Sequence, residues 1–131
     1  MRIIVIGGAG LSEQVAGALQ KAGDEVTVID TDAGREAAMA KVGLRSVLGD
    51  AAVPSTLEAA GALRADVLVA CTRSDEDNLV ISVLAKKHFN VPRVIARVND
   101  PANEELFDES WGVDTLVSPS TSLVSMIRQT T

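Results

Sequence analysis

The feature that most constrains the fold of this chain is a glycine-rich turn between an apolar segment and an amphipathic one. The turn reads Gly7-Gly8-Ala9-Gly10-Leu11-Ser12 and follows the continuous apolar run Arg2–Ile6. After the turn, apolar residues recur at helical spacing from Leu11 to Ala22, and Gly23 follows as a helix stop. This pattern predicts a buried strand, a tight turn and a helix, which together begin a strand–helix–strand unit.

The same alternation of apolar strands and helices continues along the chain. Further strands are expected at Glu25–Asp30, Arg45–Leu48, Val67–Ala70, Val94–Val98 and Val113–Val117. Helices are expected at Asp32–Val42, from Pro54, near Asp75–Phe89, at Asn103–Ser110 and from Ser118-Pro119. Six strands with right-handed helical crossovers predict an α/β fold, a doubly wound parallel six-stranded sheet in the order 3-2-1-4-5-6. The expected architecture is a Rossmann-like three-layer sandwich.

Composition agrees with a covered parallel sheet and argues against several classes of protein. The 131 residues suit a single domain over 1–131, and 47% of them are hydrophobic but only 2% aromatic, which favours an aliphatic core. The net charge of −6 argues against a nucleic-acid partner. One cysteine, Cys71, excludes an internal disulfide. Without a signal-peptide pattern or an apolar stretch of about 20 residues, we expect a cytoplasmic protein with no direct membrane insertion.

The candidate ligand site lies where the strand order reverses, beyond the carboxyl ends of the strands. There the backbone amides of the glycine turn and the helix N-terminus would face a pyrophosphate. Asp30 ends the second strand, roughly 20 residues after the turn, where an acid accepts hydrogen bonds from a ribose diol. Its rival role is a helix cap, which Asp32 would also fill. Because Asp30 would repel a 2′-phosphate and no arginine follows it immediately, NAD or an adenine nucleotide is favoured over NADP.

Three further positions offer polar groups at the same edge. Asp50 follows the third strand and would either reach the adenine or its ribose, or cap the next turn. After the fourth strand, Thr72 and Arg73 would approach the pyrophosphate, unless this segment only caps the next helix. Arg97 lies near the carboxyl end of a mostly apolar strand, so we expect it to have an anionic partner, either a phosphate or a carboxylate such as Asp75.

The remaining chemically distinctive residues suggest no catalytic site. His88 has no metal-ligating neighbour at a suitable spacing, and Cys71 is expected to be a small buried side chain. Phe89, Phe107 and Trp111 are interpreted as packing or interface residues. No Ser/His/Asp or Cys/His set can be assembled, and the absence of tyrosine excludes the Tyr-and-Lys pair of short-chain dehydrogenases.

The stretch from Met1 to Asp30 resembles the N-terminal domain of TrkA-type potassium-uptake regulators, also called the RCK or KTN domain. The most specific part of the resemblance is Asn90-Val91-Pro92-Arg93-Val94-Ile95-Ala96-Arg97-Val98-Asn99-Asp100-Pro101. Shorter supporting stretches occur at 49–51, 70–72, 75–76, 78–79, 85–87, 105–107, 112–114 and 117–119. The resemblance therefore covers nearly the whole chain.

This resemblance implies a regulatory module that binds NAD(H), ATP or ADP and reports it to a membrane potassium transporter or channel subunit. It implies a homodimer or a ring of dimers, held at the inner face of the membrane by that partner. The residues that it implies for the nucleotide site are Gly7, Gly8, Ala9, Gly10, Leu11, Asp30, Asp50, Ala51, Thr72, Arg73 and Arg97. The chain ends before a C-terminal ligand domain of the TrkA-C type, so we expect a fragment or a stand-alone domain.

One departure from the family pattern concerns the phosphate turn. In an ungapped alignment, G-x-G-x-x-G falls on Gly7, Ala9 and Ser12, so alanine replaces the glycine that lets the backbone approach the pyrophosphate. A register shifted by one places Glu13 at the third glycine, beside the phosphate, and we prefer the ungapped register. Two other functions stay open: the nicotinamide-binding domain of an oxidoreductase whose catalytic half is absent, and an oligomerising protein whose phosphate turn has degenerated.

Overall fold

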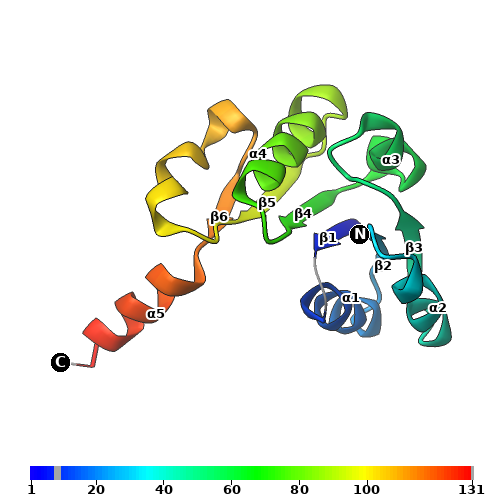
Figure 1. Cartoon of the computed structure of the whole chain (residues 1–131), viewed down its shortest axis with the longest axis horizontal. Helices are drawn as coiled ribbons and strands as arrows, with labels where there is room; N and C mark the ends of the chain where they lie inside the picture. The colour runs from blue at the N-terminus through cyan, green and yellow to red at the C-terminus, as the bar shows by residue number, and fades with distance from the viewer. Residues whose placement is uncertain (8–9, 131) are drawn as a thin grey trace.

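A six-stranded, entirely parallel sheet forms the centre of the molecule (Figure 1). The computed structural model describes residues 1–7 and 10–130. The strand order is β3-β2-β1-β4-β5-β6, which confirms the expected doubly wound topology. The strands are β1 (Arg2–Gly7), β2 (Glu25–Asp30), β3 (Arg45–Leu48), β4 (Val67–Cys71), β5 (Arg93–Arg97) and β6 (Thr115–Val117).

Helices cover both faces of the sheet and complete three layers. In Figure 1, α1 (Leu11–Lys21) and α2 (Ala33–Lys41) lie on one side of the strands. The other side carries α3 (Pro54–Ala59) and α4 (Asp75–Val83). This is the α/β sandwich that the alternating pattern predicts, since each crossover from β1 through β5 carries an α-helix.

The core consists of two aliphatic layers, one on each face. Successive residues of β1 point to opposite faces. Val5 packs with the residues under α1 and α2, whereas Ile4 and Ile6 pack on the side of α3 and α4. Fully burying such a side chain stabilises the fold by about 1.5–3 kcal/mol. The buried sheet therefore fixes the strand ends that carry the candidate site.

Two expected helices differ from what the sequence pattern suggested. The helix near Asp75–Phe89 becomes α4 followed by a π-helical turn, Leu84–His88, because Phe89 N donates to Leu84 O at 3.1 Å, five residues back. The expected helix Asn103–Ser110 is replaced by two short 3₁₀ segments, Pro101–Leu106 and Glu109–Trp111.

The burial of the cysteine and of three aromatic side chains tests the packing predicted for them. Cys71 and Phe89 are buried, as expected. Phe107 is only 3% exposed and belongs to the core cluster beneath α3 and α4, which confirms the packing interpretation and makes the interface alternative wrong. Trp111 keeps about a third of its surface exposed, at 37%.

The last helix, α5 (Pro119–Arg128), has no buried residue. It extends away from the sheet and its covering helices (Figure 1). Over the described residues, no helix combines the length and the apolar character needed to cross a membrane.

Candidate functional site

The carboxyl end of β1 lies unusually close to β4. Gly7 pairs with Cys71 in the parallel ladder. A Cβ added to Gly7 would lie 2.9 Å from both the carbonyl oxygen and the Sγ of Cys71. No side chain fits at that distance, so glycine is required by the approach of the two strands. Gly8 and Ala9 lie outside the described residues.

The beginning of α1 lies at this edge and has no side-chain cap. Gly10 precedes the helix with φ of 84°, and no side chain caps the helix there. A Cβ added to Gly10 would meet nothing within 4 Å, so the space beside it is open. The first-turn N–H groups, beginning at Leu11, have no acceptor within the helix and carry the positive end of its dipole. This arrangement suits an anion.

The packing of α1 supports the ungapped register of the glycine turn. Ser12 is completely buried, and its Oγ donates to the carbonyl oxygen of Gly7 at 3.4 Å. Ser12 therefore occupies the position where a helix packs closely on the first strand, which is the role of the third glycine. Glu13 points away from the core and pairs with another side chain instead.

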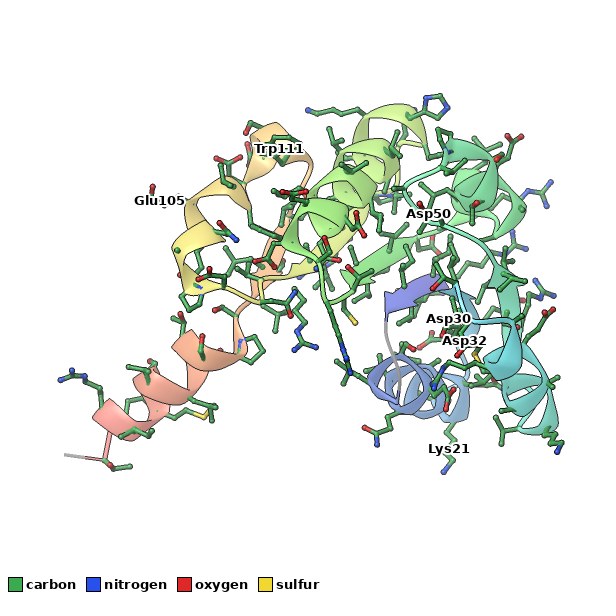
Figure 2. All side chains as sticks on the ribbon, viewed as in Figure 1. Lys21, Asp30, Asp32, Asp50, Glu105 and Trp111 are labelled. Atoms are coloured by element: carbon green, nitrogen blue, oxygen red, sulfur yellow. The ribbon has the colours of Figure 1, made fainter. Side chains whose placement is uncertain are left out.

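Asp30 ends β2 with both carboxylate oxygens engaged. Its Oδ1 accepts a hydrogen bond from Asp32 N at 2.9 Å, and its Oδ2 accepts from Arg35 Nε at 3.1 Å. Asp32, not Asp30, caps α2 by accepting from Gly34 N at 2.9 Å. Figure 2 shows Asp30 and Asp32 together at the end of β2. The helix-cap role is thus taken by Asp32.

Arg35 is a residue that the sequence argument missed. No arginine follows Asp30 immediately, yet the first turn of α2 brings the Arg35 guanidinium back to the end of β2. Its other end reaches Glu13 on α1. The available signal was an arginine in the first turn of the helix that follows the strand-ending acid.

Asp50 lies at the same edge, after β3. Its Oδ1 accepts a hydrogen bond from Ala52 N at 2.9 Å, which is the turn-capping role expected as one alternative. Ala51 is buried beneath this turn. In Figure 2, Asp50 lies on the other side of β2 and β3 from α2, next to α3. The Asp50 carboxylate is exposed and keeps lone pairs free for a ligand.

The turn after β4 is held by one buried side chain, Asn78. Its Oδ1 accepts from Thr72 N at 2.9 Å and from Thr72 Oγ1 at 2.7 Å, while its Nδ2 donates to the carbonyl oxygen of Arg97 at 2.9 Å. Asn78 therefore ties the ends of β4 and β5 together. Ser74 caps α4 by accepting from Asp77 N at 3.2 Å, so the expected helix cap is present beside the polar turn.

Arg97 is a half-buried cation at this edge that has no ion-pair partner among the described residues. Over residues 1–7 and 10–130, no acid lies within ion-pair distance of its guanidinium, and its buried Nε has no hydrogen-bond partner. Asp75 is not that partner, so this alternative was wrong. The Asp75 carboxylate accepts instead from Asn99 N at 2.7 Å and Asn103 Nδ2 at 2.8 Å.

The surroundings of Arg97 place its charge beside the glycine turn. Burial raises the pKa of the Cys71 thiol, and the nearby Arg97 guanidinium partly opposes that rise. Cys71 also pairs with Gly7 at the end of β1, so one residue connects the Arg97 charge with the strand end where the turn begins. The uncapped start of α1 follows that turn, and the Arg97 Nε has no hydrogen-bond partner among the described residues.

Comparison with known proteins identifies the family of the chain. The sequence profile of the TrkA-N domain matches residues 3–119. The chain belongs to the TrkA-N domain family. It is 41% identical over 129 residues to the Trk system potassium uptake protein TrkA of Mycobacterium tuberculosis, which covers 98% of this chain and 59% of that protein. The chain thus spans less than two thirds of that relative.

Two solved structures share the fold of this TrkA-N domain. One is the Shewanella denitrificans Kef CTD in its AMP-bound form, with a TM-score of 0.80 and 24% identity over 99% of this chain and 80% of that one. The other is the GsuK channel bound to NAD, with a TM-score of 0.75 and 20% identity over 87% of this chain and 21% of that one.

The TrkA-N fold brings most of the expected residues to one edge without closing a site around them. Gly7, Gly10 and Leu11 follow β1, Asp30 ends β2, and Thr72 and Arg97 are joined through Asn78. Arg73 is exposed and makes no polar contact with the described residues. Asn78 was recognised only as part of the family resemblance, since its role depends on the approach of β4 and β5.

Proposed function

We propose that this TrkA-N domain is a nucleotide-binding regulatory module of a potassium transport system. In this proposal it binds NAD(H), or ATP or ADP, and passes the state of the site to a membrane potassium transporter or channel subunit. The family and the names of its relatives support the potassium system. The nucleotides found in two proteins of the same fold, AMP in one and NAD in the other, support the ligand class.

The observation that carries the nucleotide proposal is the unpaired guanidinium of Arg97. The Arg97 Nε is buried and has no hydrogen-bond partner among the described residues. An unpaired buried donor is costly, and a phosphate group would supply the missing acceptor. Arg97 acts electrostatically on Cys71, which pairs with the end of β1, and the amides at the uncapped start of α1 favour the same anion. The pyrophosphate would lie between these groups.

The proposed positions of the ribose and the adenine follow from the residues at the carboxyl ends of β2 and β3. The ribose diol would donate to Asp30, and the adenine would extend over β3 toward Asp50 and Ala51. Thr72 would line the phosphates without donating to them, because Asn78 already accepts from both its backbone N–H and its hydroxyl. Arg73 would close over the phosphates from the outside. Gly8 and Ala9 complete the proposed turn, and no metal or catalytic residue is part of this proposal.

The regulatory step requires a nucleotide-dependent conformational change in the domain that alters its contact with the transporter. Nucleotide between the two halves of the sheet would bias the position of α1 and the turn after β4, and a homodimer or a ring of dimers would pass that bias to the transporter. The domain would act at the inner face of the membrane through this partner.

Binding is tested by thermal unfolding of the purified domain with NAD, NADH, ATP, ADP and AMP. A ligand at about 100 times its dissociation constant should stabilise the domain by roughly 2.7 kcal/mol. Arg97→Gln should lose most of this gain, whereas Arg45→Gln, which removes an exposed arginine of β3, should keep it. No stabilisation by any of the five nucleotides would overturn the proposal.

The potassium role is tested in the cell that makes the protein. Placing Asp30→Asn in the genomic copy of the gene should change potassium-limited growth and rubidium uptake, with the protein still present at its normal level. Asp32→Asn is the matched control, because asparagine caps a helix as well as aspartate does. Unchanged uptake in the Asp30→Asn strain would argue against the regulatory role.

The rival function, half of an oxidoreductase, makes a different prediction. No proton-transfer group stands out near the expected nicotinamide position, so we expect no NADH oxidation with small carbonyl substrates. Turnover above a control without protein would favour the oxidoreductase.

A further inference from the structure

Three charged side chains from three elements meet beside the proposed ribose position. Arg35 of α2 donates through Nε to Asp30 Oδ2 at 3.1 Å, and its Nη2 pairs with Glu13 of α1. The Asp30 side chain is 9% exposed, that of Arg35 23% and that of Glu13 34%. One cation is thus shared by two carboxylates at the edge where the nucleotide would bind.

The position of the two acids matters for an anionic ligand. Glu13 lies in the first turn of α1, whose amides are proposed to face the phosphates, and Asp30 ends β2 beside the ribose. Without a counter-charge, both carboxylates would oppose a polyphosphate, and the repulsion would grow with each phosphate charge. Arg35 supplies the counter-charge for both.

We propose that Arg35 determines how much negative charge the nucleotide site tolerates. By pairing with Asp30 and Glu13 together, it reduces the repulsion that a diphosphate or triphosphate meets. This inference rests on the proposed nucleotide function and assigns Arg35 a specificity-determining role within it. Arg35 acts on the ligand through the two acids and need not touch it.

The contacts of Asp30 separate this role from a purely structural one. Its Oδ1 is held independently by Asp32 N at 2.9 Å, so the carboxylate keeps one positioning contact when Arg35 is removed. The contact with an uncharged ribose should therefore survive the loss of Arg35. Removing Arg35 should therefore lower the affinity only for charged ligands, and more so as the ligand charge increases.

The test is a calorimetric titration of Arg35→Gln with adenosine, AMP, ADP and ATP at low ionic strength. Relative to the unaltered domain, adenosine affinity should change by less than about twofold. AMP, ADP and ATP should lose affinity in increasing steps, reaching on the order of tenfold for ATP. The loss should shrink in 1 M salt, where the screening length falls to about 3 Å.

Two further variants serve as an opposite charge change and as a control. Glu13→Gln removes one of the two acids and should tighten binding in the order ATP, ADP, AMP. Arg45→Gln makes the same change of net charge on β3, outside the Asp30–Arg35–Glu13 cluster, and should leave the charge series unchanged. Thermal unfolding without ligand reports whether each variant is folded.

The outcomes distinguish this inference from the proposed function. An equal loss for adenosine and ATP would make Arg35 a structural residue and overturn the inference, as would no loss for any ligand. A loss confined to NADP in a parallel titration would make Arg35 a contact for the 2′-phosphate, which also overturns it. If the unaltered domain binds none of these ligands, the proposed function itself fails.

Discussion

Asp30 accepts two hydrogen bonds before any ligand arrives, and each affects what its substitution should do. Asp30→Asn removes the charged acceptor for the ribose, which should weaken NAD or ATP binding by about 1.5–3 kcal/mol, the range for hydrogen bonds to charged groups. It also releases Arg35 from its partner at 3.1 Å, so a 2′-phosphate would meet less repulsion. The ratio of NAD to NADP affinity, measured by calorimetry, should therefore fall.

Asp32→Asn is the control for this experiment, since it changes the same charge one residue beyond the site and preserves the cap of α2. If Asp30→Asn binds NAD as tightly as the parent, the ribose role assigned to Asp30 is wrong.

Ala9 provides the second prediction at the level of single residues. Ser12 packs where the third glycine of the fingerprint belongs, which places Ala9 at the second. Its methyl group would then keep a phosphate from one backbone amide, at a cost of about 1–3 kcal/mol. Ala9→Gly should tighten nucleotide binding by about tenfold for each 1.4 kcal/mol recovered. Unchanged affinity in a calorimetric titration would defeat the ungapped register.

Single residues also show where prediction from sequence ends. The position of Asp30 could be predicted because it ends the second expected strand. Its distance along the sequence from the glycine turn also matches that of the ribose-binding acid in the dinucleotide fingerprint. Its partner Arg35 was missed, because an arginine in the first turn of the next helix is a weak signal and only the structure shows that its guanidinium turns back toward the strand. Arg97 was expected to pair with an anion. The sequence could not decide between Asp75 and a ligand, because the choice depends on the hydrogen bonds that Asp75 accepts from the segment after β5.

At the scale of elements, Asp75 joins the start of α4 to the segment after β5. Burial raises its pKa, but hydrogen bonds from the side chain of Asn103 and from Asn99 and Asp100 outweigh this, so the pKa is lowered from 3.8. A lowered folded-state pKa gives stability that is fully present above the unfolded-state value and is lost as pH falls through the folded value. The Asp75 contribution should therefore disappear in acid.

Asp75→Asn tests this link between α4 and β5. The new amide would turn a donor toward groups that also donate, so we expect the free energy of unfolding to fall by about 1–3 kcal/mol at pH 7. Urea unfolding at pH 7 and near pH 3 should show the difference from the parent shrinking in acid. Asp77→Asn, in the same first turn, controls for the helix dipole. A difference that stays constant with pH would contradict the assignment.

The elements themselves show why strands were easier to predict than their connections. Each strand was located to within two residues. Buried aliphatic side chains mark the four central strands β1, β2, β4 and β5, whereas the edge strands β3 and β6 have no buried residue. The segment between β5 and β6 was predicted as one helix and instead forms two 3₁₀ segments. Asp100 and Asp108 accept from the backbone two residues ahead, at 3.0 and 2.9 Å, and such local bonds compete with a continuous helix.

At the scale of the whole molecule, α5 stands out because none of its residues is buried against the rest of the domain. All of its residues are exposed, including the apolar side chains Leu123 at 61% and Ile127 at 65%. An isolated helix shorter than about 12–15 residues is marginal in water, so the ten residues of α5 need a surface to pack on. The exposed apolar side chains would be buried in a dimer or larger assembly.

Leu123→Asp together with Ile127→Asp should then convert a dimer to a monomer, because two charges would enter the apolar contact without partners. Ser125→Asp is the control, since at 100° per residue Ser125 lies on the opposite side of α5 from these two residues. Light scattering over a range of concentrations reports the mass directly. A parent domain that stays monomeric at high concentration, or a dimer that survives the double substitution, would show that α5 does not hold two copies together.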